Sequence, residues 1–364
     1  MRPVAKHLMK GNEALAEAAI RAGLKGYFGY PITPQSELLE YLSRELPHRG
    51  GVFVQAESEL AAVNMVYGAA GTGERVMTST SSPGFSLMQE GISYIACAQL
   101  PCLLVNVVRG GPGLGTIQPS QCDYFQAVKG GGHGDYRLIV LVPDSVQEMA
   151  DFVYLGFDLA DKYRNPVLIL ADGMLGQMME EVEFAESGRV KHRADHSSWT
   201  TVGRENGRER HIITSLFLNP EVMEEVNLTL QAKYDSIQKN EVRFETVLTD
   251  DADYLVVAYG LSARVCHRAV ELARQDGMKV GLLRPQTVFP FPSQPLSTLA
   301  SKVRGMLVVE MSAGQMVEDV RLAVDGKVPV EFYGRMGGMI PTPEEIFTQI
   351  KSHFSVVQLA EMIR

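Results

Sequence analysis

Three residues suited to acid–base or carboxylate chemistry lie directly after predicted buried strands. Glu59 follows "VFVQA", Arg109 follows "CLLVNVV", and Thr33 lies between two prolines in "GYPITP". Ligands of open α/β sheets bind at the carboxyl ends of the strands, so these side chains are candidates for one site. They offer a carboxyl group that could donate a proton, a guanidinium that could grip a carboxylate, and a stiffly held hydroxyl.

Two of these residues also have purely structural interpretations. Glu59 begins the alanine-rich helix "LAAVNMVYGAAG", where a carboxylate can simply stabilise the helix dipole. In a buried cleft it would instead act as a proton donor, because burial disfavours the charged form of a carboxyl group. Arg109 could grip a ligand carboxylate through two parallel hydrogen bonds or form a structural salt bridge. The sequence leaves both pairs of alternatives open.

Two further loops that follow predicted strands, and one that precedes a strand, remain ambiguous. The "SSPG" segment, formed by Ser81, Ser82, Pro83 and Gly84, is either an ordinary turn or a surface that contacts the edge of a heterocycle. "GGPGLG" is a poor dinucleotide fingerprint because its glycine spacing is wrong and its proline removes a donor. It is a flexible loop or a loop that positions Arg109. His133 in "GGGHGDY" is a loop histidine or a catalytic base.

The elements that must position these loops follow an α/β rhythm. From residue 13 to 172, helical patterns alternate with short apolar runs, each predicted to be a buried strand, "VFVQA" included. This alternation predicts a parallel sheet covered by helices. Thr33 and Pro34 are expected to be the N-cap and first residue of a helix. Ser145 and Glu148 are expected to form a capping box.

The chain is expected to fold as two domains joined by a linker. The first domain spans residues 1–190, and charged residues dominate the linker, 191–248, which ends in a helix that is solvated or faces a partner. The α/β rhythm returns in residues 249–364, with helices expected at about 262–275, 315–324 and 343–354. This part is predicted to be a second, smaller α/β domain.

Composition excludes several classes of function. The 364 residues carry a formal net charge of −9, which argues against binding nucleic acid. The four cysteines form no CxxC pair, so they predict buried free thiols rather than a zinc or iron–sulfur site. The N-terminus lacks the features of a secretory signal, and no apolar run of about 18 residues suggests a membrane span. We therefore expect a reducing, cytoplasmic location.

The loops in their order resemble a known family. "YPITP", "QAESELAA", "TSTSSPGFSLMQEGISY", "VRGGPGLGTIQPSQCDYFQAVKGGGHGDYRLIVL", "PVLILADG" and "RPQTVFPFP" are similar to signatures of the alpha chain of the 2-oxoacid:ferredoxin oxidoreductases, which depend on thiamine diphosphate. The resemblance runs from "MKGNEALAEAAIRAG" to "GRMGGMIPTPEEI". "SSPGFSLMQEG", "GGPGLG" and "GGGHGDY" most resemble the branched-chain type, which acts on 3-methyl-2-oxobutanoate.

The resemblance implies domains and residue roles. It implies a thiamine-diphosphate-binding fold, with a pyrimidine-binding first domain and a transketolase C-terminal-like second domain. Glu59 matches the glutamate that hydrogen-bonds the cofactor's aminopyrimidine, Arg109 the arginine that meets the substrate carboxylate, and Thr33 the threonine beside the reacting carbon. The segment from Ser81 to Gly84 would lie near the pyrimidine.

The sequence lacks the diphosphate half of such a site. Thiamine enzymes usually hold the diphosphate and Mg²⁺ with a GDG motif and an asparagine about thirty residues later. "HGDY" with Asn165 and "ADGMLG" with Asp172 each meet only part of this pattern. The resemblance therefore implies a beta chain that carries the diphosphate, Mg²⁺ and a [4Fe-4S] cluster. It further implies gamma and ferredoxin-like delta chains, with ferredoxin and coenzyme A as co-substrates.

Three functions remain to be weighed. The first is oxidative decarboxylation of 3-methyl-2-oxobutanoate with coenzyme A to acyl-CoA, CO₂ and reduced ferredoxin. The second is the same reaction on 2-oxoglutarate or pyruvate. The third is a non-catalytic assembly subunit that keeps the fold.

Overall fold

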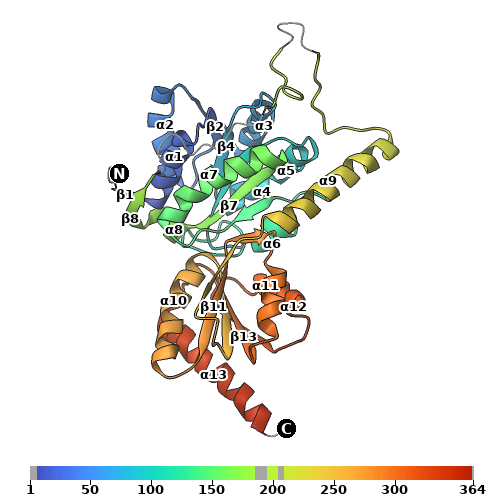
Figure 1. Cartoon of the computed structure of the whole chain (residues 1–364). Coiled ribbons are helices and arrows are strands. Elements are labelled where there is room, and N and C mark those ends of the chain that lie inside the picture. Colours follow the sequence, from blue (N-terminus) through green and yellow to red (C-terminus); the bar gives the residue numbers. More distant parts are fainter. Residues whose placement is uncertain (1–5, 185–194, 204–208, 363–364) are drawn as a thin grey trace, which may run out of the picture.

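A seven-stranded sheet and a five-stranded sheet form the two halves of the chain (Figure 1). The computed structural model describes residues 6–184, 195–203 and 209–362. In Figure 1 the larger sheet lies above and the smaller one below, and the end of the C-terminal helix extends beyond the smaller sheet.

The larger sheet has the strand order β12-β6-β7-β5-β4-β2-β3. Every pairing among the six first-half strands is parallel. The strands are β2 (Gly26–Gly29), β3 (Val52–Gln55), β4 (Val76–Thr80), β5 (Cys102–Val108), β6 (Ile139–Leu141) and β7 (Pro166–Asp172). β5 and β7 are buried along their whole length, which explains their mainly apolar sequences; the buried Asn106 inside β5 donates a hydrogen bond to the Asp123 side chain.

Helices cover both faces of this sheet. Alternate residues of β5 point to opposite sides: Leu103 joins the core with α1 and α7, and Leu104 joins the core with α3 and α5. The helices are α1 (Gly11–Arg21), α2 (Ser36–Glu45), α3 (Glu59–Ala70), α4 (Ser82–Leu87), α5 (Gln89–Cys97), α6 (Tyr124–Val128), α7 (Val146–Tyr163) and α8 (Gly173–Gln177). A short antiparallel pair, β1 (Lys6–Lys10) and β8 (Met179–Glu183), flanks them.

The smaller sheet has the order β14-β13-β10-β11-β9. Its strands are β9 (Phe244–Val247), β10 (Tyr254–Val257), β11 (Val280–Pro285), β13 (Gly305–Glu310) and β14 (Val330–Gly334). α10 (Gly260–Gln275) and α13 (Pro343–Met362) pack on one face, and α11 (Ser293–Ala300) and α12 (Met316–Val324) pack on the other. The sheet is parallel except for β9, which pairs antiparallel with β11.

The two halves are joined through backbone and side-chain contacts. β12 (Thr287–Phe289) leaves the second half and pairs antiparallel with β6 at the edge of the larger sheet. Gln121 also bridges them: its side chain donates to the Tyr259 carbonyl at 2.8 Å and accepts from Ser262 Oγ at 2.7 Å and the Met311 N–H at 2.9 Å. The halves therefore share hydrogen bonds as well as apolar contacts.

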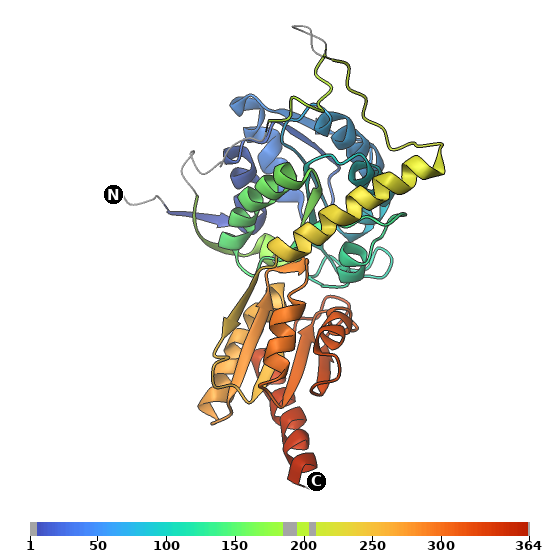
Figure 2. The ribbon, with the colours of Figure 1, turned by 45° about the vertical axis from the view of Figure 1, so that its right-hand side comes forward.

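The charged helix of the linker is partly buried. α9 (Pro220–Asn240) crosses the first half (Figure 2) and buries Leu230, Tyr234 and Ile237. The spacing of these three residues places them on one helix face among charged neighbours. The expectation of a solvated or partner-facing helix was therefore wrong for this face. The division of the chain into two domains and a linker, with boundaries at residues 190 and 248, remains a proposal. β9 lies inside the proposed linker although it belongs to the second sheet.

Two local expectations were also wrong. "VFVQA" is an edge strand rather than a buried one, and Val52 is 56% exposed. The helix after "GYPITP" begins at Ser36, with Gln35 rather than Thr33 at the N-cap. The Pro34 carbonyl accepts hydrogen bonds from the side chains of Asn12 and Gln177, which satisfy it outside the helix. Ser145 caps α7 and accepts from the Glu148 N–H, as predicted, but the Glu148 carboxylate accepts from the Asp144 N–H, so the predicted capping box is only half formed.

Candidate active site

Glu59 lies buried where the parallel strands end. It is the first residue of α3, whose N-cap Ser58 accepts a hydrogen bond from the Ala61 N–H at 3.2 Å. Because Glu59 is the first residue of this helix, its side chain lies inside the fold, and the residue is only 5% exposed. Thr80, the last residue of β4, donates to Glu59 Oε1 at 3.4 Å. The carboxyl group thus faces the end of the neighbouring strand rather than bulk water.

The segment from Ser81 to Gly84 packs directly against that carboxyl group. A Cβ atom built on Gly84 would lie 2.2 Å from Glu59 Oε1 and 2.1 Å from Thr80 Oγ1, so only glycine fits here. Ser81 is fully buried, and its hydroxyl has no hydrogen-bond partner among the described residues. An unsatisfied buried hydroxyl is costly and therefore suits a ligand that would bond it.

Ser82 connects this loop to Arg109. Its hydroxyl accepts from the Arg109 N–H at 3.1 Å and donates to the Arg109 carbonyl at 3.2 Å. Pro83 follows in the first turn of α4 and lines a cavity described below. The loop therefore contacts Glu59 on one side and the end of β5 on the other.

Arg109 binds the backbone of the "GYPITP" loop. Its Nη1 donates to the Thr33 carbonyl at 3.0 Å, and the residue is 9% exposed. Within the described parts of the chain, Arg109 forms no ion pair and its buried Nε has no hydrogen-bond partner. The structural salt bridge considered from the sequence is thus not found there, and a nearly buried cation remains to bind an anion. Thr33 itself is exposed.

The structure therefore brings the sequence-predicted residues into one chain of contacts. Glu59 touches Gly84, Ser82 bonds Arg109, and Arg109 bonds Thr33. No hydrogen bond joins Glu59 directly to Arg109 or Thr33 within the described residues. The loops meet as expected for the carboxyl ends of parallel strands.

A cavity of about 750 Å³ opens beside this loop cluster, between the two halves of the chain. The first half contributes Ser82, Pro83, Ser86, Gly111, Pro112, Gly113, Ser120, Cys122, Asp123, Phe125 and Gln126, and the second half contributes Met311, Ser312, Ala313, Gln315, Met336 and Gly337. The "GGPGLG" loop is a cavity wall held against the second half, because a Cβ on Gly110 would lie 2.9 Å from the Gly337 and Gly338 backbone.

The sequence did not predict that the second half of the chain would form one wall of this cavity. Glu310, at the end of β13, is fully buried and accepts from the backbone N–H groups of Gln315, Met316 and Val317 and from Ser312 Oγ. Burial raises the pKa of Glu310, and the backbone hydrogen bonds oppose that shift. The available signal was an acidic residue that ends an apolar strand and precedes the polar segment "MSAGQ".

The two partial diphosphate motifs have structural explanations. Asp172 is the N-cap of α8 and accepts from the N–H groups of Met174 and Leu175. Burial raises its pKa to about 6, against these backbone hydrogen bonds and one from Leu261. Asn165 is fully buried and donates to the Arg137 and Pro166 carbonyls. The Asp172 carboxyl group and the Asn165 amide nitrogen are thus engaged by backbone groups of the chain, whereas the buried Asn165 Oδ1 has no hydrogen-bond partner among the described residues.

His133 lies outside the loop cluster, beside a separate cavity. The cysteines are free thiols, and one of them, Cys122, lines the larger cavity. The His133 carbonyl accepts from Ser93 Oγ, and its ring meets Tyr94 edge-on beside a separate cavity of about 110 Å³. This arrangement favours the loop-histidine interpretation. All four cysteines are free, as predicted, but only Cys102 and Cys266 are buried, whereas Cys97 and Cys122 are partly exposed. Burial raises the pKa of the Cys122 thiol beside the larger cavity.

Comparisons with known proteins agree with this architecture. A solved split-gene transketolase superposes with a TM-score of 0.59 at 13% identity, covering 94% of this chain and 97% of that one, which shows the fold alone. A family model for the thiamine-diphosphate-binding domain of pyruvate flavodoxin/ferredoxin oxidoreductases matches residues 17–245. Core domain II of pyruvate:ferredoxin oxidoreductase matches residues 252–346. The fold and the site thus define a transketolase-like protein with a thiamine-diphosphate-binding domain.

More specific relatives give the family. Ketoisovalerate oxidoreductase subunit VorB of Methanothermobacter marburgensis is 53% identical over 96% of this chain and 98% of its own length. 2-Oxoglutarate synthase subunit KorA of Methanothermobacter thermautotrophicus is 37% identical over 95% and 98%. The chain belongs to the pyruvate flavodoxin/ferredoxin oxidoreductase family of oxidoreductases. The predicted resemblance and fold class are confirmed.

A solved structure extends the comparison. The 2-oxoglutarate:ferredoxin oxidoreductase from Magnetococcus marinus, with 2-oxoglutarate, coenzyme A and succinyl-CoA bound, superposes with a TM-score of 0.86 at 28% identity. The match covers 97% of this chain and 66% of that longer one. Separately, the helices in the described parts of the chain include none long and apolar enough to cross a membrane.

Proposed function

We propose that this chain is the alpha-type subunit of a ketoisovalerate oxidoreductase. The complex would convert 3-methyl-2-oxobutanoate and coenzyme A to acyl-CoA, CO₂ and reduced ferredoxin. The main support is sequence identity. The chain is 53% identical to a ketoisovalerate oxidoreductase subunit over almost the full length of both chains, but only 37% identical to 2-oxoglutarate synthase subunits. Identity that high over both domains favours the branched-chain substrate over 2-oxoglutarate or pyruvate.

Thiamine diphosphate fits the residues around Glu59. The unsatisfied Ser81 hydroxyl and the buried Glu59 carboxyl group, which packs closely against Gly84, are polar groups suited to the edge of an aminopyrimidine. When bound, the cofactor supplies a carbon nucleophile and an electron sink for 2-oxoacid decarboxylation. Glu59 would hold a proton at its carboxyl oxygen against the ring nitrogen, and residues 81–84 would hold the ring in place and exclude water.

Arg109 and Thr33 would bind the substrate. The Arg109 guanidinium, fixed by the Thr33 carbonyl, still has N–H groups to donate to a substrate carboxylate. The Thr33 hydroxyl would donate to a substrate oxygen from a loop already ordered by two prolines and by the Arg109 bond. Because the loop is already ordered, less conformational entropy is lost when the substrate binds.

The remaining half of the site would belong to partner chains. Both partial diphosphate motifs serve their own backbone here, so we assign the diphosphate, Mg²⁺ and a [4Fe-4S] cluster to a beta chain. Gamma and ferredoxin-like delta chains would complete a cytoplasmic complex that passes electrons to ferredoxin. The relatives named above are themselves subunits, which supports partner chains.

Two measurements test this proposal. The assembled complex should turn over 3-methyl-2-oxobutanoate with a higher kcat/KM than 2-oxoglutarate or pyruvate, in the presence of coenzyme A and ferredoxin. A preference for 2-oxoglutarate would refute the substrate assignment. Thiamine diphosphate titrated into the isolated chain should bind poorly, and addition of the beta chain should restore binding. Full turnover by the isolated chain with a dye acceptor would refute the divided site.

A further inference from the structure

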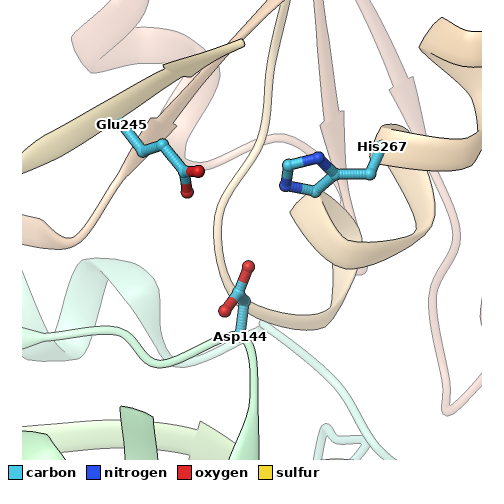
Figure 3. A group of neighbouring side chains, drawn as sticks. All are labelled: Asp144, Glu245 and His267. Carbon is cyan, nitrogen blue, oxygen red and sulfur yellow. The ribbon is translucent and has the colours of Figure 1, made fainter.

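Three metal-ligating side chains converge at the junction of the two halves, away from Glu59 and its loops. Asp144 lies just after β6, Glu245 lies on β9, and His267 lies on α10. One ligand atom from each lies within 4.8 Å of the others. Figure 3 shows the imidazole and the two carboxylates pointing toward a common centre. All three residues are partly buried.

A single buried guanidinium cannot balance the charge of this cluster. Arg284, 3% exposed, bonds Glu148 through two contacts of 2.7 and 2.8 Å and Glu245 at 2.9 Å, and approaches Asp144 at 3.3 Å. Three carboxylates therefore face one cation. The neighbouring pairs Arg264–Glu180 and Arg268–Glu271 on α10 are each neutral, so they leave this excess unchanged. Burial and the neighbouring carboxylates Glu148 and Glu245 raise the pKa of Asp144 to about 7, so a proton on Asp144 offsets part of this excess negative charge near neutral pH, and a cation bound there would take the place of that proton.

His267 is the second feature that calls for a ligand. Its imidazole forms no hydrogen bond or ion pair with any described residue, although it is half-buried beside two carboxylates. A neutral imidazole in such a position offers a nitrogen lone pair to a cation. Asp144 and Glu245 each use one oxygen on Arg284, which leaves the other Glu245 oxygen available to a cation. The Asp144 carboxyl group also hydrogen-bonds Glu148 and would exchange that bond for the cation.

We propose that Asp144, Glu245 and His267 bind a divalent transition-metal ion such as Zn²⁺ between the two halves of the chain. One nitrogen and two oxygen ligands suit Zn²⁺ or Mn²⁺, whereas Mg²⁺ and Ca²⁺ prefer oxygen alone. With bonds of about 2.1 Å, ligand atoms in a tetrahedral site lie roughly 3.4 Å apart, so the cluster closes by on the order of 1 Å on binding. Glu245, whose side chain is 43% exposed on an edge strand, is free to make that movement and to leave an entry path.

The ion would act as a clamp between the halves. Two positive charges on the metal and one on Arg284 equal the three carboxylate charges, so the junction becomes neutral. Asp144 belongs to the first half, and Glu245 and His267 belong to the second. The same junction separates the two walls of the 750 Å³ cavity. A bound ion would therefore fix the spacing of the cavity walls without touching their ligand.

Zinc binding to the full chain tests this proposal. After treatment with a chelator and dialysis, the chain should take up one equivalent of Zn²⁺ by calorimetric titration, and Zn²⁺ should raise its apparent Tm in a concentration-dependent way. Mg²⁺ should do neither. His267→Ala and Asp144→Asn should each weaken Zn²⁺ binding by about a hundredfold or more, since each removes a ligand.

Matched variants separate this site from surface binding. His48→Ala removes an exposed histidine on another element and should leave Zn²⁺ affinity unchanged. Glu245→Gln keeps the size of the side chain and should weaken binding even if His267→Ala misfolds. No uptake of Zn²⁺, or equal affinity in His267→Ala, Glu245→Gln and the unaltered chain, would overturn the proposal.

Discussion

Gly84→Ala is the substitution whose effect the structure constrains most closely. The added Cβ would lie 2.2 Å from Glu59 Oε1 and 2.1 Å from Thr80 Oγ1, whereas real contacts of this kind are essentially never under 3.0 Å. The Glu59 carboxyl group must therefore retreat by at least 0.8 Å. A misplacement of about 1 Å at a catalytic group costs roughly a hundredfold in rate, so we expect a loss of that size in kcat.

The assay is turnover of 3-methyl-2-oxobutanoate by the complex assembled with the variant chain. Gly68→Ala is the matched control, because Gly68 lies exposed in α3, the same helix as Glu59, and a Cβ there would meet no atom within 4 Å. It should keep full activity and gain up to about 1 kcal/mol of stability. Full turnover by a correctly assembled Gly84→Ala complex would refute the placement of the loop against a catalytic carboxyl group.

Three further predictions concern substrate binding and the junction. Arg109→Ala should raise the KM for the 2-oxoacid more than it lowers kcat, because the substrate carboxylate loses its binding partner. Steady-state kinetics of the assembled complex measure this, and an unchanged KM would contradict the role of Arg109 in carboxylate binding. Asp172→Asn tests a carboxyl group whose pKa rises on folding from 3.8 to about 6. The native chain binds the extra proton between these values, so stability of the unaltered chain should fall by roughly 3 kcal/mol as pH rises from about 3 to 7, relative to the variant in denaturant unfolding. A pH-independent difference would contradict it. Gln121→Leu removes the partners of the Tyr259 carbonyl, Ser262 Oγ and the Met311 N–H, and chemical denaturation should show a loss of about 3 kcal/mol or more; a loss under about 1 kcal/mol would mean that the junction does not depend on these bonds.

The sequence was sufficient for the fold because its signals are local. β5 and β7 are mainly apolar and buried along their whole length, with Asn106 the one polar residue inside β5 and Asp172 at the end of β7. The loops that follow parallel strands must meet at one edge, so Glu59, Ser82, Arg109 and Thr33 could be grouped from the order of strands and loops along the chain.

The missed features depend on how distant segments dock. Nothing local in "MSAGQ" indicates that Met311 and Gln315 would face the "SSPG" loop, since that contact is set by the packing of two sheets. The crossing of β12 to β6 is equally non-local. Val52 has the sequence of a buried strand residue, yet β3 forms the sheet edge and leaves it exposed. Strand composition reports β propensity, whereas the position of a strand in the sheet follows from topology.

The activity of the Glu59→Gln complex is the most direct test of the central claim. The amide keeps the size of the side chain but lacks the proton that the carboxyl group would hold against the cofactor ring, so kcat for 3-methyl-2-oxobutanoate should fall by about a hundredfold or more. Glu57→Gln, an exposed neighbour in the same loop, should leave kcat unchanged. If Glu59→Gln turns over substrate within about threefold of the unaltered complex, Glu59 is not the acid of this site, and the chain is better described as an assembly subunit.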